Sequence, residues 1–405
     1  MSRRDARRDG VLDAVVVGAG VVGATAALAL AAEGCSVALV EARPPPPWQR
    51  GMPDLRVVAF APDNAALLDT LGVWGAIRDA RVQPYRTMRV WDAAGGAPLV
   101  FDADALARPE LGWIVESALL VDRLWAALAP AGVQVVCPDH VVGLVQDDDE
   151  ATLTLASGAW LRARLVVAAD GAESQLRALA GIDTFTRDYG QSGVVAFVDT
   201  ESAHAATCRQ RFLPGGPLAL LPFADDDAVD PAFRGHRSSI VWSVAEAEAR
   251  RLLALDDDDF RAELTRASSA VLGDVTWVST RAAFPLRRQL AERYSAGRVA
   301  LLGDAAHVVH PLAGQGVNLG LRDVAALRAL ARDRRGRDLG AVRPLARWAR
   351  ERRSENAVAA YAFDGLNRLF SNDAVLPTLL RGPLLGAAGR LPPLNHAFWR
   401  HAAGL

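Results

Sequence analysis

The stretch Val11–Gly23, VLDAVVVGAGVVG, decides the fold. Its short β-branched run predicts a buried strand, and the alanine-rich Val21–Glu33 predicts the helix that follows. Gly18 permits the tight turn between them, Gly20 lets the backbone approach a pyrophosphate, and Gly23 lets the helix pack closely on the strand. The N-terminus of such a helix offers free N–H groups and a partial positive charge to phosphates.

A second strand and an acidic residue complete this pattern. Ser36–Val40 predicts a parallel neighbour of the first strand, and Glu41 stands at its end. An acidic residue there accepts hydrogen bonds from adenosine ribose hydroxyls and disfavours a 2′-phosphate. The order strand, helix, strand and acid predicts a dinucleotide-binding unit, although the pattern does not separate FAD from NAD.

The composition excludes several classes of site. The chain has 405 residues and a net charge of -2, so no overall electrostatic attraction to nucleic acid is expected. Cys35, Cys137 and Cys208 are scattered, which fits a reducing cytosol and forms neither a disulfide framework nor a metal cluster. All 45 basic residues are arginine, which excludes Schiff-base chemistry and a P-loop lysine.

The order of the elements predicts two intertwined domains. Strands around Val133–Ala169 and Arg298–Leu302 and helices over Gly316–Arg332 and Val342–Phe370 belong to an α/β domain built from both ends of the chain. A mostly antiparallel sheet is inserted into it. The expected division assigns 1–75, 102–184 and 285–405 to the α/β domain, 76–101 to an excursion of the substrate domain, and 185–284 to its β-sheet.

Two later motifs carry a family resemblance. Val166–Arg177, VVAADGAESQLR, is similar to the Asp-Gly motif of the single-component aromatic-ring flavoprotein monooxygenases, and Leu301–Gly320, LLGDAAHVVHPLAGQGVNLG, resembles their Gly-Asp motif. Among these enzymes the chain most resembles the ubiquinone-biosynthesis hydroxylases of the UbiH/UbiF group, over nearly its whole length. One departure is Glu116-Ser117, where the family commonly has Glu-Asn.

The resemblance implies a fold and a cofactor. The fold is an α/β, Rossmann-like FAD-binding domain of the aromatic hydroxylase type, with an inserted, mostly antiparallel β-sheet substrate domain and C-terminal helices. FAD is expected to bind non-covalently. The residues expected to bind it are Gly18, Gly20, Gly23, Glu41, Arg56, Asp170, Gly171, Arg177, Gly303, Asp304, Gly314, Gly316 and Asn318.

Several of these residues have expected roles. Asp304 is expected to accept hydrogen bonds from ribityl hydroxyls, while backbone N–H groups near Gly314 and Gly316 stabilise negative charge on reduced flavin. The resemblance places Asn318 near the flavin pyrimidine and Arg56 on the other side of the cofactor. Asp170 and Arg177 belong to a motif tied to both FAD and NAD(P)H.

Other side chains are expected to line the site. Pro311 and His310 are expected at the flavin face where oxygen reacts, and no catalytic base is assigned. His307 and His310 lack further metal ligands in suitable spacing, so we expect hydrogen-bonded histidines and no metal. The weak candidates for the substrate pocket are Phe223, Trp242 and Phe284, although a tryptophan is more often part of a core.

The resemblance implies a monooxygenase that hydroxylates a polyprenylated phenol in ubiquinone biosynthesis. It uses dioxygen and a transient reductant, NADH or NADPH. No signal peptide or apolar run long enough to span a membrane is visible, so a cytoplasmic enzyme is expected. The prenyl tail suggests contact with the inner face of a bacterial membrane or with a complex of the pathway. The apolar segment 376–394 is a candidate for that contact, for packing on the protein itself, or for a homodimer.

Three alternatives remain open at this point. A hydroxylase of small soluble phenols or aromatic acids would share every flavin motif. A flavin reductase acting on an isoprenoid lipid would need no oxygen. A non-enzymatic protein that binds lipid on a degenerate flavin fold is disfavoured by the intact motifs at Gly18, Asp170 and Asp304.

Overall fold

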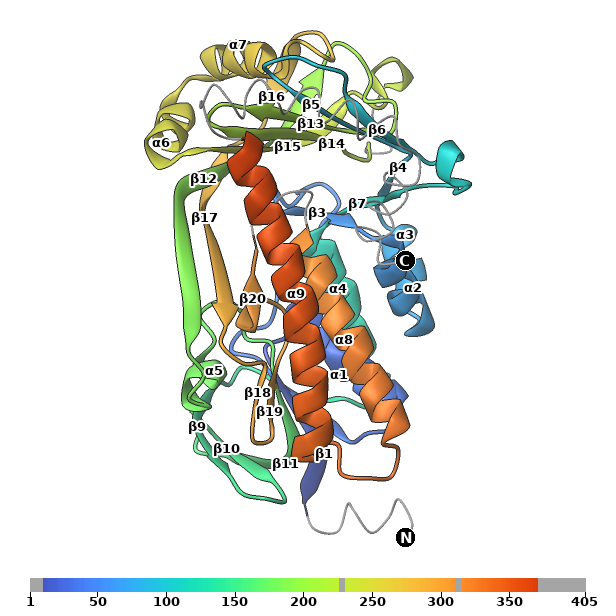
Figure 1. Ribbon diagram of the computed structural model, residues 1–405. Coiled ribbons are helices and arrows are strands. Elements are labelled where there is room, and N and C mark those ends of the chain that lie inside the picture. The colour runs from blue at the N-terminus through green and yellow to red at the C-terminus, as the bar shows by residue number, and fades with distance from the viewer. Residues whose placement is uncertain (1–9, 226–229, 310–314, 371–405) are drawn as a thin grey trace.

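The strands of the protein form three sheets in the computed structural model, which describes residues 10–225, 230–309 and 315–370. An α/β body lies at one end and a β-sheet capped by two short helices at the other (Figure 1). Two long strands, β12 and β17, connect the two ends.

The first sheet forms the α/β body. Its main path runs β18-β19-β11-β1-β2-β8, with β10 and β9 attached to β11 as an antiparallel ribbon. The neighbours of β1, which are β11 and β2, run parallel to it. The strands are β1 (Val11–Val17), β2 (Val37–Val40), β8 (Gln134–Val136), β9 (Val141–Gln146), β10 (Ala151–Leu155), β11 (Trp160–Ala168), β18 (Ser295–Ala296) and β19 (Val299–Leu301).

Helices cover this sheet. The helix predicted after Gly20 is α1, Val21–Ala32, and its many alanines allow close contact with α4 (Ser117–Leu128) and α8 (Gln315–Asp333). Helix α9 (Val342–Phe370) lies beside α8 and runs toward the far end of the molecule (Figure 1). The remaining helices are α2 (Pro62–Thr70), α3 (Trp74–Arg78), α5 (Gln175–Leu179), α6 (Glu246–Ala254), α7 (Asp257–Ser268) and the 3₁₀ turns η1 (Asp104–Leu106), η2 (Pro231–Phe233) and η3 (Gly303–Ala305).

The second sheet has nine strands and is mostly antiparallel. Its path is β20-β17-β12-β15-β14-β13-β5-β6, and only the pair β13–β5 on this path is parallel within the described residues. This sheet confirms the prediction of an inserted, mostly antiparallel sheet. Its strand β17 continues past the domain boundary expected between residues 284 and 285. The strands are β5 (Thr87–Asp92), β6 (Leu99–Asp102), β12 (Thr184–Thr200), β13 (Thr207–Leu213), β14 (Gly216–Pro222), β15 (Arg237–Ala245), β16 (Val275–Val278), β17 (Ala282–Ala291) and β20 (His307–Val308).

The nine-stranded sheet buries both of its faces. Its outer face packs under α6 and α7 in a core that includes Trp242 and Phe260. Its inner face packs on a small sheet of β3 (Val57–Phe60), β4 (Gln83–Tyr85) and β7 (Gly112–Glu116). We call the side chains between these two sheets the inter-sheet cluster. It comprises Ala59, Ile114, Phe197, Cys208, Leu221 and Phe223, with Leu55, Val57, Tyr85, Met88, Ala219 and Val241 packed against them.

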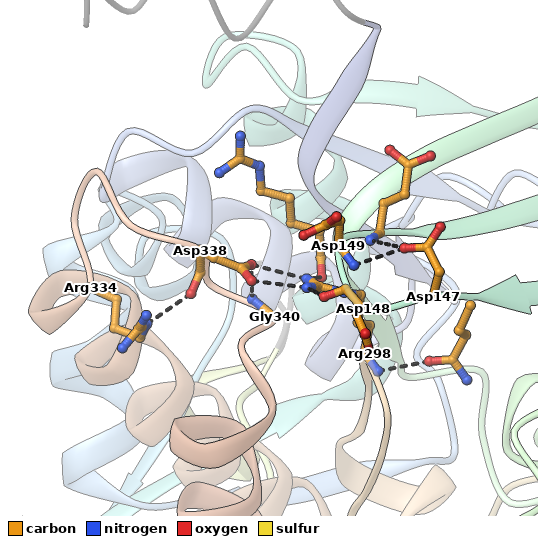
Figure 2. A network of polar contacts seen from close by, with 10 residues as sticks. Asp147, Asp148, Asp149, Arg298, Arg334, Asp338 and Gly340 are labelled. Carbon is orange, nitrogen blue, oxygen red and sulfur yellow. Dashed lines mark hydrogen bonds and ion pairs between the residues drawn. The ribbon is translucent and has the colours of Figure 1, made fainter.

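A buried arginine connects several loops at the end of the α/β body that is remote from the nine-stranded sheet. Arg298 donates to both carboxylate oxygens of Asp338 at 3.0 Å and to the carbonyl oxygens of Arg164 and Asp148 (Figure 2). Asp338 in turn accepts a hydrogen bond from the N–H of Gly340. These contacts tie the α8–α9 connection to the turn between β9 and β10.

A second ion cluster joins α1 to α8. The Glu33 carboxylate, which is 4% exposed, accepts hydrogen bonds from Arg328 and Arg332 at 2.9 Å and from Arg335 at 3.0 Å. The hydrogen bond from Arg332 lowers the pKa of Glu33 from 4.5 to about 2, with Arg328 adding to the effect and burial opposing it. Glu33 is therefore more acidic in the folded chain than in the unfolded chain.

We predict that Glu33→Gln lowers the free energy of unfolding at pH 7 by about 2 kcal/mol, the scale of hydrogen bonds to a charged group. Because the folded pKa lies below the unfolded one, the stabilisation is complete above about pH 4.5 and is lost as the pH falls toward 2. Urea unfolding at pH 7, 5, 4 and 3 should show the difference between variant and wild type shrinking with acid. Glu351→Gln, which breaks the exposed pair with Arg347, is the control and should have little effect at any pH. A difference in the free energy of unfolding between Glu33→Gln and wild type that does not depend on pH would contradict the lowered pKa of Glu33.

Candidate cofactor and substrate site

The glycine turn between β1 and α1 has the geometry expected of a phosphate cradle. A Cβ at Gly18, where φ is +93°, would lie 2.3 Å from the carbonyl oxygen of Ala169, and one at Gly23 would lie 1.9 Å from that of Gly18. These two glycines are required by the protein's own packing. A Cβ at Gly20 would meet no protein atom within 4 Å, so the space above the N-terminus of α1 is open to a ligand.

Two long-range hydrogen bonds fix this turn. Glu41 accepts a hydrogen bond from the N–H of Ala19 at 2.7 Å, and Trp125 on α4 donates to the carbonyl oxygen of Ala19 at 2.8 Å. Glu41 thus holds the turn through one carboxylate oxygen. Its contact with a ribose remains a prediction.

The Asp-Gly motif is tied to the Gly-Asp motif by an arginine. Asp170 accepts hydrogen bonds from the Ser174 hydroxyl and from the N–H of Leu176, which fixes the start of α5. The buried Arg177 donates to the carbonyl oxygen of Ala305 at 3.0 Å and to that of Ala172 at 2.9 Å. Arg177 therefore positions the two motifs relative to each other. Gly171, inside the Asp-Gly motif, has φ +84°.

Asp304 lies in a recess. Its side chain is exposed and makes no hydrogen bond to a described residue. Burial nevertheless raises its pKa, while His307 and Arg287 oppose that shift. A carboxylate that is accessible and yet desolvated by surrounding protein has the surroundings of a ligand site. Arg287, which is paired with Glu173, is a neighbour of this recess that sequence reasoning missed.

Behind this recess lies a buried carboxylate that the sequence did not reveal. Asp323 on α8 is 0% exposed and accepts hydrogen bonds from the N–H of Gly303 (3.2 Å), His307 Nε2 (2.7 Å), Arg352 Nε (2.9 Å) and Asn356 Nδ2 (2.9 Å). Burial alone would raise the pKa of Asp323, but His307 and Arg352 hold it below its usual value. An acidic residue on the apolar face of a predicted helix was the available signal. We call this group the Asp323 hub.

The contacts of the Asp323 hub confirm the expectation that His307 is a hydrogen-bonded histidine. His307 is a buried, hydrogen-bonded histidine, stacked on Tyr294 with ring centroids 6.0 Å apart. Within the described residues no group of three or more His, Cys, Asp or Glu side chains has an arrangement that could hold a metal ion.

Asn318 joins the first turns of α8 to the small sheet. Its side chain accepts a hydrogen bond from the N–H of Ala61 at 3.0 Å and donates to the carbonyl oxygen of Ala59 at 2.7 Å. It also accepts one from Asn64 at 2.9 Å. A contact between Asn318 and flavin remains a prediction, as does one with Gly316, where a Cβ would meet no protein atom within 4 Å.

The segment before β3 is held by Glu116, the residue next to the departure from the family pattern. Glu116 is buried and accepts hydrogen bonds from Trp48 Nε1 (3.2 Å), the N–H of Asp54 (2.8 Å) and Arg81 Nε (2.8 Å). The Arg81 guanidinium lies 5.3 Å from the ring centroids of both Trp48 and Phe223. Arg81 thereby joins the α/β body to the nine-stranded sheet, a link that no sequence motif indicated.

The other candidates fall in three places. Arg56, at the end of the held segment, is 75% exposed and lies 3.7 Å from Asp54. Trp242 lies in the outer core under α6 and α7, away from the inter-sheet cluster that contains Phe223. Phe284 is half-buried on β17 opposite Gly193. His310, Pro311 and Gly314 lie outside the described residues, as does the segment 376–394.

These features fit FAD. The open cradle at Gly20 and the recess at Asp304 are separate, and they follow β1 and β19, the two strands that flank β11 in one parallel part of the sheet. A dinucleotide that spans this edge would place its pyrophosphate on α1 and its ribityl chain at Asp304.

Comparison with known proteins agrees with this geometry. Residues 11–356 match the model of the FAD binding domain family. The chain is 41% identical to ubiquinone hydroxylase UbiL of Rhodospirillum rubrum, covering 98% of this chain and 90% of that protein. It is 37% identical to 3-demethoxyubiquinol 3-hydroxylase of Escherichia coli, covering 96% and 98%. The chain belongs to the FAD-dependent hydroxylases of ubiquinone biosynthesis.

Solved structures show the same fold. The p-nitrophenol 4-monooxygenase PnpA of Pseudomonas putida superposes with a TM-score of 0.76 at 21% identity, over 96% of both chains. HpxO of Klebsiella pneumoniae, complexed with FAD and uric acid, gives 0.71 at 22% identity. The enzyme is an FAD-dependent aromatic-ring monooxygenase, as the sequence motifs predicted. Among the helices of the described residues, none combines the length and apolar character needed to cross a membrane.

We predict that Gly20→Ala weakens FAD binding at least about tenfold, the cost of one lost or distorted hydrogen bond to a phosphate. The apoprotein should unfold at the wild-type temperature, because the new Cβ meets no protein atom. Gly23→Ala is the matched control: it should lower the unfolding temperature of the apoprotein, since its Cβ collides with the Gly18 carbonyl. Flavin content and thermal unfolding measure both. Equal loss of stability in the two variants would refute the inference that Gly20 serves the ligand and Gly23 serves the packing of the protein.

Asp304→Asn should also weaken FAD binding about tenfold or more, since a charge-assisted hydrogen bond is lost. The apoprotein should be at least as stable as wild type at pH 7, because the raised pKa of Asp304 means that folding disfavours its charge. Asp323→Asn should instead destabilise the apoprotein, because four donors face its buried carboxylate. Thermal unfolding without FAD compares the stability of the two variants. If Asp304→Asn destabilised the apoprotein, the inference that folding disfavours the charge of Asp304 would be wrong.

Proposed function

We propose that this enzyme hydroxylates the aromatic ring of a polyprenylated phenol on the pathway to ubiquinone. Its identity to two hydroxylases named for ubiquinone and demethoxyubiquinol carries the proposal, because it extends over nearly the full length of each chain. Bound FAD would supply the redox chemistry, taking electrons from NADH or NADPH and activating dioxygen for transfer of one oxygen atom to the ring.

The interface between the sheets supports such a substrate. The inter-sheet cluster joins the nine-stranded sheet to β3, and β3 continues into the Ala59–Ala61 backbone that Asn318 holds beside α8. An apolar lining there excludes water from the reacting ring, which oxygen transfer requires. The role of the protein is mainly to hold the ring near the flavin.

The charges of this region favour a phenol over an aromatic acid. Arg81, which stacks on Phe223, is already paired with Glu116 in a buried contact of 2.8 Å. A substrate carboxylate would need a cation of its own to offset the loss of hydration. A phenol with an apolar tail has no such requirement.

The tail of the substrate implies contact with lipid. Each buried methylene of a prenyl chain favours an apolar environment by about 0.8 kcal/mol, so a long chain remains in the membrane. We therefore propose that the enzyme receives its substrate at the membrane surface or from a lipid-carrying partner.

The decisive test uses purified enzyme loaded with FAD. A short-chain prenylated phenol should stimulate NAD(P)H oxidation strongly, whereas salicylate and 4-hydroxybenzoate should not. Under ¹⁸O₂ the product should gain one labelled oxygen, and under H₂¹⁸O it should gain none. An unlabelled product would overturn the monooxygenase reaction, and equal stimulation by the soluble acids would overturn the substrate class.

The ring position follows from a genetic measurement. Deletion of the gene should cause accumulation of one polyprenylated precursor, and mass spectrometry of that precursor identifies the carbon that lacks its hydroxyl. Expression of the wild-type chain should remove the precursor, whereas Gly20→Ala should do so poorly because it binds FAD weakly. An unchanged quinone profile after deletion would count against the proposed function.

A further inference from the structure

One hydroxyl beside the inter-sheet cluster is accessible to a ligand. Tyr85, at the end of β4, packs against the cluster, and its hydroxyl makes no hydrogen bond to another described residue. The side chain is half-buried, and its oxygen is not among the enclosed polar atoms that lack a partner, so it keeps accessible surface. A hydroxyl at the edge of apolar surroundings can exchange a bound water for a polar group of a ligand.

The position of this hydroxyl is set by a glycine. Tyr85 and Gly112 are cross-strand partners, and a Cβ at Gly112 would lie 2.9 Å from the Tyr85 hydroxyl and 2.6 Å from the carbonyl oxygen of Phe60. The hydroxyl therefore extends across β7 toward the end of β3. At that end the backbone of Ala59 and Ala61 is bonded to Asn318 in the first turns of α8. This is the side of the small sheet where the flavin ring is expected.

We propose that the Tyr85 hydroxyl binds the substrate, donating a hydrogen bond to an oxygen substituent on its aromatic ring. This proposal rests on the proposed function and adds to it the residue that orients the ring. One directed contact within an apolar site fixes the rotation of the ring and so selects the carbon presented for hydroxylation.

The chemistry of the group suits this role. Burial raises the pKa of Tyr85 well above its usual value, with Cys208 adding to the effect. The hydroxyl consequently stays protonated at physiological pH and can serve as a neutral donor. Neutral pairing avoids placing a charge in the apolar cluster.

A second hydroxyl on the same face serves as a comparison. Ser239 pairs with Leu221 on β14, and Leu221 belongs to the cluster. Its hydroxyl also lacks a partner among the described residues, but Ser239 is only 1% exposed. Tyr85 is accessible and Ser239 is enclosed, so only Tyr85 can meet a substrate without rearrangement of the sheet.

The test compares Tyr85→Phe with wild type, both loaded with FAD. The probes are a short-chain prenylated phenol and its deoxy analogue, in which hydrogen replaces the ring oxygen. Both are titrated by the change in flavin absorbance, and the phenol is also assayed by NAD(P)H oxidation. Wild type should bind the phenol about three- to tenfold more tightly than the deoxy analogue, the value of one neutral hydrogen bond. Tyr85→Phe should bind both with the affinity that wild type has for the deoxy analogue. Ser239→Ala, the control, should behave as wild type, and FAD content should be unchanged in all three.

The outcomes separate the two proposals. If wild type prefers prenylated phenols to soluble acids but Tyr85→Phe discriminates between the phenol and its deoxy analogue as wild type does, the role of Tyr85 is overturned and the proposed function stands. If wild type shows no preference for prenylated phenols, the proposed function itself fails. Should Tyr85→Phe lose FAD or unfold, the binding measured with wild type decides: equal affinity of wild type for the phenol and its deoxy analogue overturns the role of Tyr85.

Discussion

The buried carboxylate of Asp323 fixes several distant parts of the molecule relative to one another. It accepts hydrogen bonds from the backbone N–H of Gly303, in the loop expected to bind FAD, from His307, and from two side chains of α9. His307 also pairs through its backbone with Leu290 of β17, a strand of the nine-stranded sheet. A buried charge is tolerated only when such partners compensate for lost hydration, so the loop, α9 and the sheet edge are fixed together.

Around this hub the site is built before the cofactor arrives. Glu41 and Trp125 hold both polar groups of Ala19 in the glycine turn, and Arg177 joins the two cofactor motifs. Asp304 is the exception, because its carboxylate is accessible, its pKa is raised by the surrounding protein, and it has no partner within the described residues. Hydroxyl groups of a bound ligand could donate hydrogen bonds to this carboxylate and stabilise its charge. Binding at this end of the cofactor would then be favoured.

The interface proposed to bind the substrate follows a different principle. Between the two sheets the protein places apolar side chains and neutralises the charge of Arg81 with Glu116. Specificity in such a site depends on a few polar contacts, since an apolar pocket rejects an analogue of similar size only weakly. Membership of the hydroxylase family fixes the reaction, whereas the geometry of this interface bears on which ring is accepted.

The sequence by itself determined the dinucleotide unit, the inserted sheet and the cofactor motifs at Gly18, Asp170 and Asp304. These depend on local requirements: a turn without Cβ atoms, a strand period and a helix N-terminus. It did not reveal the Asp323 hub, the contact of Glu116 with Asp54 across 62 residues, or the hydroxyl of Tyr85. Those depend on which faces of distant strands and helices meet, and only the packing of the whole chain decides that.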